Sequence, residues 1–209
     1  MKRTAFLLAP LLLAFLGFCA WHTPLRGPLT DAEVDAFMAS QAAAGGSDWT
    51  DMEAVEAFLR ADDGRPFVMI NLMEVRDVAK YPEGYGSEIA LGTEADAIYG
   101  QAVLPLLLRR GSYPVVQARR YHTIINSVGA TAGQFDRFAM VRYRSRRDLI
   151  DMLSSDAFIA AGVHKWASLE NTLVAPASPG LSFQLIGYVP FVFMVLIASV
   201  IGQAAFRKR

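Results

Sequence analysis

Long apolar stretches lie near both ends of the chain, and the region between them mixes hydrophobic and polar residues at regular intervals. Residues 5–21 carry no charged side chain and follow Lys2 and Arg3, which is the layout of a signal peptide or a signal anchor. Cleavage of a signal peptide favours small residues just before the cut, and Phe18 is bulky. We therefore expect residues 1–24 to form an uncleaved N-terminal signal anchor, with a removed leader as the alternative.

The second apolar stretch predicts a transmembrane helix over residues 181–206. Residues 185–202 are free of charge, and a helix of that length is about 27 Å long, close to the hydrocarbon thickness of a bilayer. The cluster Arg207-Lys208-Arg209 follows it, and such clusters favour the cytoplasmic side. Because both basic ends then lie in the cytoplasm, we expect a cell (inner) membrane protein whose central domain is extracytoplasmic.

In the central region, a hydroxyl residue stands three positions before a carboxylate at the start of each of four amphipathic runs. A hydroxyl at this position accepts a hydrogen bond from a free backbone N–H, and the acid lies at the positive end of the helix dipole. The pairs are Thr30 with Glu33, Thr50 with Glu53, Thr93 with Asp96, and Ser145 with Asp148. They predict helices over residues 31–43, 51–61, 94–110 and 146–167.

Four further segments have the branched, apolar or alternating pattern of strands. They cover residues 66–75, 113–126, 135–145 and 171–175. The order within residues 66–178 is then β-α-β-β-α-β, an α+β, ferredoxin-like arrangement of an antiparallel sheet with two helices on one face. The helices within residues 25–65 look too short and too acidic to cover the other face, so we expect a homodimer in which two sheets close a shared barrel.

Composition and charge exclude several functional classes for this protein. The 20 basic and 20 acidic residues balance, and no dense basic run suggests a nucleic-acid partner. One cysteine excludes a disulfide scaffold, and neither a metal-ligand spacing nor a phosphate-binding loop is present, so we expect no metal and no cofactor. Residues 31–96 hold 15 acidic and 4 basic residues, and residues 97–170 hold 5 and 10. This predicts that the two halves pack against each other, within one chain or across a dimer, with a polyanion site on the basic half as the alternative.

Two passages resemble the dimeric α+β barrel superfamily. MVRYRSRRDLIDMLSSDAF at residues 140–158 resembles its strand-to-helix passage, with a serine cap, an amphipathic turn and a Ser-Asp-x-Phe segment. YGQAVLPLLLRRG at residues 99–111 resembles the first helix of the superfamily's uncharacterised domain-of-unknown-function subgroup. The resemblance covers residues 66–176, about half the chain, and it implies the ferredoxin-like fold and a dimer rather than an activity.

The superfamily includes haem-degrading and cofactor-free quinone-forming monooxygenases, lactone isomerases and proteins with no known reaction, and the similarity to the antibiotic-biosynthesis and haem-degrading members is weaker. Haem-degrading members carry an asparagine on the first strand, a tryptophan early in the second helix and a haem-ligand histidine farther along that helix. Asn71 matches the asparagine, but Met152 and Gly162 stand at the other two positions. His164 lies two residues on, which rotates its side chain by ~200°. The resemblance therefore argues against haem degradation.

Asn71 is the first candidate binding residue because it interrupts an apolar strand. Phe67, Met69 and Met73 share its face in the predicted alternation, so this face has the apolar character of a ligand pocket. A buried amide needs hydrogen-bond partners, and these are either a ligand or backbone near a strand edge.

Five more polar residues on the predicted strands and the last helix are candidates. Arg119 and Arg142 could each bind a carboxylate through two hydrogen bonds, or pair with acids across a dimer or at a sheet edge. Tyr121 and Tyr143 could donate to an oxyanion, or pack half-buried. His164 could act as a general base near neutral pH, or mark an exposed helix end. We predict His164 and Tyr143 as catalytic residues and Asn71, Arg119, Arg142 and Tyr121 as ligand-binding residues.

These expectations favour a membrane-anchored barrel protein that binds a small lipophilic ligand or a membrane partner, with no reaction assignable. One alternative is a cofactor-independent monooxygenase or isomerase acting on an aromatic or quinone-like substrate. That enzyme requires Asn71, an arginine, and a tyrosine or His164 to converge within hydrogen-bond reach. The other alternative is a structural subunit of a membrane complex.

Overall fold

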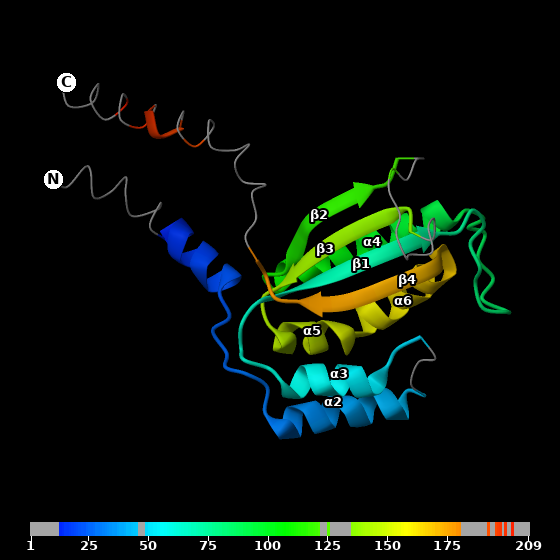
Figure 1. Cartoon of the computed structure of the whole chain (residues 1–209), viewed down its shortest axis with the longest axis horizontal. Coiled ribbons are helices and arrows are strands. Elements are labelled where there is room, and N and C mark those ends of the chain that lie inside the picture. Colours follow the sequence, from blue (N-terminus) through cyan, green and yellow to red (C-terminus); the bar gives the residue numbers. More distant parts are fainter. Residues whose placement is uncertain are drawn as a thin grey trace. The chain divides into compact units, whose positions relative to one another are not determined.

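The computed structural model describes residues 13–45, 49–121, 125, 135–180, 192, 195–197, 199 and 202. The chain divides into two compact units, Met1–Ser178 and Pro179–Arg209. The first unit contains the sheet, its helices and all six candidate site residues (Figure 1).

The first unit is built on a four-stranded antiparallel sheet with the strand order β2-β3-β1-β4. Its strands are β1 (Phe67–Val75), β2 (Tyr113–Arg119), β3 (Arg137–Tyr143) and β4 (Leu169–Ala177). Helix α4 (Gly92–Arg109) follows β1, and helices α5 (Arg146–Leu153) and α6 (Asp156–Ser168) follow β3. This order confirms the predicted ferredoxin-like α+β fold.

The alternation of β1 and β3 separates a helix-facing side of the sheet from an open side. Phe67 lies opposite Tyr143, and Met69 lies opposite Val141. These four side chains pack on the same buried core as Val103, Leu106 and Leu107 of α4 and Leu149 and Met152 of α5. The odd-numbered residues of β1, Asn71 among them, therefore face the helices, and the even-numbered residues face the other way.

The open side of the sheet is apolar. Its residues on the central strands include Ile70, Leu72, Phe138 and Met140, and Leu173 on β4 is 48% exposed. In Figure 1 this side is turned toward the viewer, with α4 and α6 behind the sheet. Among the described residues of this unit, no helix lies across it.

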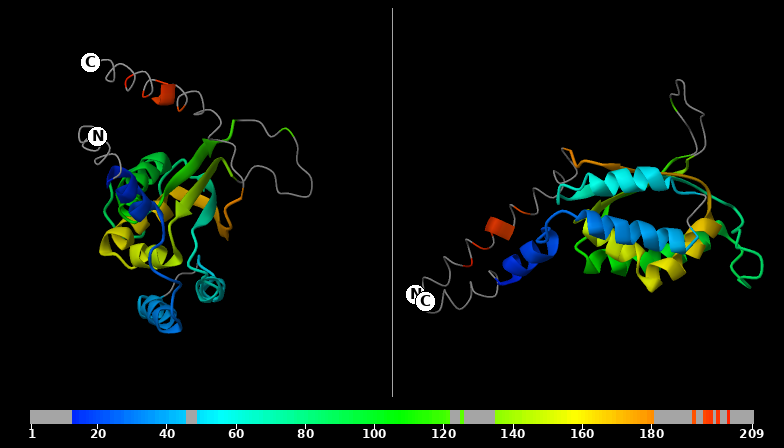
Figure 2. Two further views of the ribbon diagram at one scale, coloured as in Figure 1. Left: turned by 90° about the vertical axis from the view of Figure 1, so that its left-hand side faces the viewer. Right: turned by 90° about the horizontal axis from the view of Figure 1, so that it is seen from below.

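Two N-terminal helices pack beside α5, away from the open face. Helices α2 (Asp31–Ala43) and α3 (Met52–Arg60) bury Val34, Phe37 and Leu59 against each other, and Ile150 of α5 packs on this cluster. Figure 2 shows them along one side of the two-layer domain. The ion pairs Arg147–Glu33 and Arg146–Asp62 join them to α5, as the opposite charges of the two halves predicted.

The predicted capping residues begin α2 but not every helix. Thr30 accepts a hydrogen bond from the Glu33 N–H, and the Glu33 carboxylate accepts one from the Thr30 N–H. α3 begins after Asp51, not Thr50, because the Asp51 carboxylate accepts from the Ala54 N–H. The predicted cap at Thr50 is therefore wrong by one residue, since Asp caps a helix at least as well as Thr.

Helix α4 begins at Gly92, and the predicted cap at Thr93 is wrong. The Glu94 carboxylate instead accepts a hydrogen bond from the Leu91 N–H. A Cβ at Gly92 would overlap the carbonyl oxygen of Arg76, so the helix start lies tightly against the end of β1. Only glycine permits this approach.

The single helix predicted over residues 146–167 is wrong, because the chain breaks into α5 and α6 at Ser154 and Ser155. The Ser155 hydroxyl donates to the Met152 carbonyl at 2.6 Å, and Ser155 then precedes the first turn of α6. Serine favours such local hydrogen bonds over a continuous helix.

Among the described residues, no helix is both long enough and apolar enough to span a bilayer. The described part of the first predicted span is a helix over residues 13–22, and residues 5–12 lie outside the described residues. Most of the second predicted span, 181–206, also lies outside them. Both spans therefore stay predictions.

Candidate functional site

Three side chains able to donate hydrogen bonds meet between the sheet and helices α4 and α6, and we call Tyr99, Tyr143 and Lys165 the donor cluster. Tyr143 ends β3 on the helix-facing side, where its ring stacks on Phe67 at 5.2 Å between centroids. Tyr99 comes from α4 and Lys165 from α6. The strand register and the packing of the two helices thus bring residues far apart in sequence to one place.

Aromatic rings surround the donor cluster. The Tyr99 ring meets Phe158 edge-on at 6.4 Å. The Lys165 ammonium lies 5.9 Å from the Tyr99 ring centroid and 4.9 Å from that of Trp166. Cation–π contacts of this kind are worth about 0.5–1 kcal/mol at exposed sites and about 2 kcal/mol when desolvated. The walls of the cluster are therefore apolar, while its functional atoms are polar.

Burial is the main cause of a pKa shift in each of the three side chains of the donor cluster. Burial and then the Asp96 carboxylate raise the pKa of Tyr99 to about 12. Burial raises the pKa of Tyr143, and the neighbouring Tyr99 phenol adds to this shift. Burial lowers the pKa of Lys165 from its ordinary value. Both phenols therefore remain protonated donors at neutral pH, and Lys165 releases its proton more readily than an exposed lysine.

The three groups of the donor cluster are not hydrogen-bonded to one another or to other described side chains. Within the part of the chain that the structure describes, neither phenol forms a side-chain hydrogen bond, and Lys165 forms no ion pair. The nearby Asp96 carboxylate is paired with Arg137. Carbonyl, enolate or carboxylate oxygen is the group that two phenols and an ammonium recognise.

His164 contacts the loop after β1 rather than the donor cluster. Its Nδ1 is 2.8 Å from the Tyr81 hydroxyl, and the Tyr81 ring stacks on Tyr85 at 5.1 Å. The Lys80 N–H donates to the Ala167 carbonyl at 2.8 Å and holds this loop against the end of α6. His164 and Lys165 are ~100° apart on the helix, so His164 contacts the loop at Tyr81 while Lys165 contacts Tyr99 of α4.

Comparison with known proteins gives relatives only among solved structures, because no family model and no curated protein matches. RPA0582, a protein of unknown function from Rhodopseudomonas palustris, is 24% identical with a TM-score of 0.55, covering 64% of this chain and 96% of that one. Its methylated form gives 24% and 0.56, covering 65% and 96%. The chain has the ferredoxin-like α+β barrel fold.

A more distant likeness is to SnoaB, a cofactor-independent oxygenase from Streptomyces nogalater. The two chains are 7% identical with a TM-score of 0.37, over 57% of this chain and 98% of that one. At this distance the likeness says nothing about the chemistry of the barrel domain.

The remaining predicted binding residues lie in three separate places. Asn71 faces the helices, but its amide donates to the Met69 carbonyl at 3.2 Å and lies roughly 13 Å along β1 from Phe67. Arg142 faces the open side and donates at 3.0 Å to the carbonyls of Gly111 and His22. The predicted convergence of Asn71, an arginine, and a tyrosine or His164 is therefore not found.

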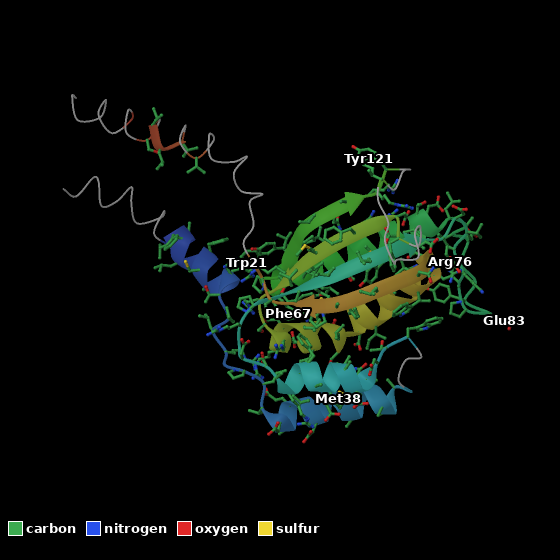
Figure 3. All side chains as sticks on the ribbon, in the orientation of Figure 1. Trp21, Met38, Phe67, Arg76, Glu83 and Tyr121 are labelled. Carbon is green, nitrogen blue, oxygen red and sulfur yellow. The ribbon has the colours of Figure 1, made fainter. Side chains whose placement is uncertain are left out.

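Arg119 and Tyr121 lie at the far end of β2, where both are exposed. Tyr121 is 90% exposed, and Figure 3 shows it at the opposite end of the sheet from Phe67. Of the six predicted site residues, only Tyr143 belongs to the donor cluster.

Sequence reasoning missed Tyr99 and Lys165, although both carry a recognisable signal. Tyr99 stands four residues from Ala95 and from Val103, which are both buried on the inner face of α4. Lys165 stands four residues after Ala161, which is buried on the inner face of α6. Side chains four apart share a helix face, so a tyrosine or lysine in such a row points inward. No three His, Cys, Asp or Glu side chains of the described residues are grouped to hold a metal.

Proposed function

We propose that the barrel domain binds a small, mainly apolar ligand that carries a carbonyl or carboxylate oxygen, and that it does so as a membrane-anchored, extracytoplasmic homodimer. The observation that supports ligand binding is the donor cluster, in which two protonated phenols and an ammonium lie close together without a side-chain hydrogen bond or ion pair to other described residues. A hydrogen bond to a charged group contributes about 1.5–3 kcal/mol, so a ligand oxygen there gains substantial affinity.

The rings around the donor cluster favour a ligand with an apolar body. Phe67, Phe158 and Trp166 lie against the three polar groups. Binding sites for lipophilic molecules combine such apolar walls with a few polar groups that fix orientation. An aromatic acid or a quinone-like compound has this combination.

The open face of the sheet supports the homodimer. Ile70, Leu72, Phe138, Met140 and Leu173 form an apolar surface on the side opposite the helices. Such a surface is unfavourable in water, and a second sheet packed about 10 Å away covers it. A dimer through this face would not cover the donor cluster, because this cluster lies on the other side of the sheet.

The membrane attachment rests on the apolar ends of the chain. In the described helix over residues 13–22, Leu13, Phe15, Leu16 and Phe18 are all more than half exposed. A helix with such a surface is stable in lipid or against another protein. The basic residues that flank both apolar stretches favour cytoplasmic ends and an extracytoplasmic barrel domain.

Ligand binding is tested with the full chain in detergent, titrated with naphthoate, naphthoquinone and naphthalene by calorimetry. We expect naphthalene, which lacks an acceptor, to bind most weakly. Lys165→Met should weaken naphthoate binding on the order of tenfold to a hundredfold, as loss of one charge-assisted hydrogen bond predicts. Lys80→Met, an exposed lysine outside the donor cluster, serves as the matched control. Equal affinity of all three probes for both variants would contradict the proposal.

The same preparation distinguishes the alternatives. Mass spectrometry of the purified chain should detect a co-purifying lipophilic compound. A stoichiometric protein partner with no small molecule would instead support a structural subunit. Turnover of naphthoquinone or a hydroquinone without added cofactor would support a monooxygenase or isomerase.

A further inference from the structure

The C-terminal end of the apolar helix over residues 13–22 is bound by residues of the barrel domain. We call Gly111, Tyr113, Arg142 and Arg144 the arginine socket. Arg142 donates to the His22 carbonyl at 3.0 Å, and Arg144 donates to the Trp21 carbonyl at 3.2 Å. These two arginines are 120 or more residues away from the carbonyls that they bind, so the contacts join the helix to the sheet.

Aromatic contacts reinforce this junction. The Trp21 ring stacks on Tyr113 at 5.8 Å, and its Nε1 donates to the Leu108 carbonyl at 2.6 Å. The His22 Nε2 is 3.0 Å from the Tyr113 hydroxyl. Figure 3 shows Trp21 at the end of the helix, beside the end of the sheet where Phe67 lies. The side chains of the last two residues of this helix, Trp21 and His22, are therefore both held by the domain.

Gly111 provides the space for the Trp21 carbonyl. Its φ of +64° is the left-handed conformation that glycine adopts most readily. A Cβ at this position would overlap the carbonyl oxygen of Trp21. Glycine is therefore required at position 111 for two reasons. It adopts the positive φ of the turn after α4, and its lack of a Cβ lets the Trp21 carbonyl approach.

The socket is electrostatically matched to the C-terminal end of a helix. The last carbonyls of a helix lack hydrogen-bond partners and carry partial negative charge, and arginines satisfy both needs. Asp148 holds Arg144 through two hydrogen bonds of 2.9 and 2.6 Å, which leaves one guanidinium nitrogen for Trp21. In the described residues Arg142 has no carboxylate partner and uses backbone carbonyls instead.

We infer that the mature protein keeps residues 13–22 and that the arginine socket holds this helix in a fixed orientation to the barrel domain. Cleavage after Ala20 would turn the Trp21 nitrogen into an ammonium group. That charge would lie within about 7 Å of the Arg144 guanidinium, where like charges repel. Cleavage would also remove the helix dipole that the arginines complement. The socket therefore fits a retained helix, not a new N-terminus.

The first test is the intact mass of the chain purified from membranes. A mass that includes residues 13–22 is the expected result, and a mass that begins at Trp21 or later overturns the inference. This measurement does not involve the donor cluster, so failure of the ligand proposal leaves it unaffected.

The second test measures how rigidly the helix is held. Cys19 is the only cysteine in the sequence, so one spin label on Cys19 and one on the exposed position of Ala160→Cys form a defined pair. Labelled chains are diluted with unlabelled chains so that distances within one chain dominate. We expect a single narrow distance distribution by pulsed electron resonance. A broad distribution in this otherwise unaltered chain overturns the inference.

Variants of the socket complete the test. Gly111→Ala and Arg142→Gln should each replace the narrow peak with a broad distribution. Gly86→Ala is the matched control, because Gly86 also has a positive φ, +69°, but a Cβ there meets nothing within 4 Å. A narrow peak retained in both socket variants, or lost in the control as well, contradicts the role of the socket. Arg142→Gln leaves the turn at Gly111 intact and covers the case in which Gly111→Ala does not fold.

Discussion

We expect Lys165→Met to stabilise the barrel domain at pH 7, because burial disfavours the ammonium in the folded chain. The ammonium is partly buried with no ion pair among the described residues. Taking an unpaired polar group partly out of water costs about 1–3 kcal/mol. Methionine removes that cost but loses the contacts with the Trp166 ring at 4.9 Å and the Tyr99 ring at 5.9 Å, each worth about 0.5–1 kcal/mol. The net gain in unfolding free energy is about 0–1 kcal/mol.

The gain should depend on pH in a direction that follows from the pKa of Lys165. Burial lowers this pKa in the folded chain relative to its ordinary value of 10.5. Between the lowered folded pKa and 10.5 the unfolded chain binds more protons, so the stability of the unaltered protein rises with pH in this window. The advantage of Lys165→Met is therefore full below the folded pKa and disappears as the pH approaches 10.5.

Urea unfolding in detergent at several pH values between neutrality and the ordinary lysine pKa measures both effects. Lys80→Met is the control, and we expect its stability difference to stay small at every pH, because Lys80 is exposed. A Lys165→Met variant that is less stable than the unaltered protein at pH 7, or a gain that does not change with pH, would refute the reasoning. Either result would make Lys165 a structural residue.

Three other changes test separate parts of the molecule. Tyr143→Phe keeps the stacking on Phe67 but removes a donor, so naphthoate affinity should fall on the order of fivefold to tenfold in calorimetry while stability changes by less than about 1 kcal/mol. Arg147→Met breaks the ion pair with Glu33 and should destabilise the packing of α2 and α3 on α5 by about 1–3 kcal/mol, seen as faster hydrogen exchange in α2. Leu72→Arg places a charge on the open face and should prevent the proposed dimer, so that the variant sediments as a monomer in analytical ultracentrifugation with an unchanged circular dichroism spectrum.

The fold was accessible from the sequence because its signals are local. The Thr30–Glu33 box lies within four consecutive residues, and the alternation of β1 and β3 lies within each strand. The element order then leaves few topologies, and the ferredoxin-like arrangement is one of them. The helix break at Ser154 was missed because serine also occurs inside helices, and tertiary packing decides between the two.

The candidate site was less accessible because its geometry depends on packing between distant segments. Tyr99, Tyr143 and Lys165 meet only after α4 and α6 are aligned on the sheet. Arg142 was predicted to bind a ligand carboxylate, but it binds the carbonyl of His22, which is 120 residues away. A sequence pattern identifies an arginine that needs an acceptor but not which acceptor the fold supplies.

The break between α5 and α6 changes which residues of α6 point toward the core. Met152 and Ala161 both lie in the buried core, with 1% and 4% exposure. In one continuous helix these residues, nine positions apart, would be ~180° apart around the axis, so one of them would point into solvent. At the two serines α5 ends and α6 begins with a different orientation around the helix axis. Met152, Ala161 and Lys165 therefore all lie on the inner side. Inserting or deleting one residue within α6 should therefore rotate Lys165 out of the donor cluster, whereas α5 would keep its own orientation.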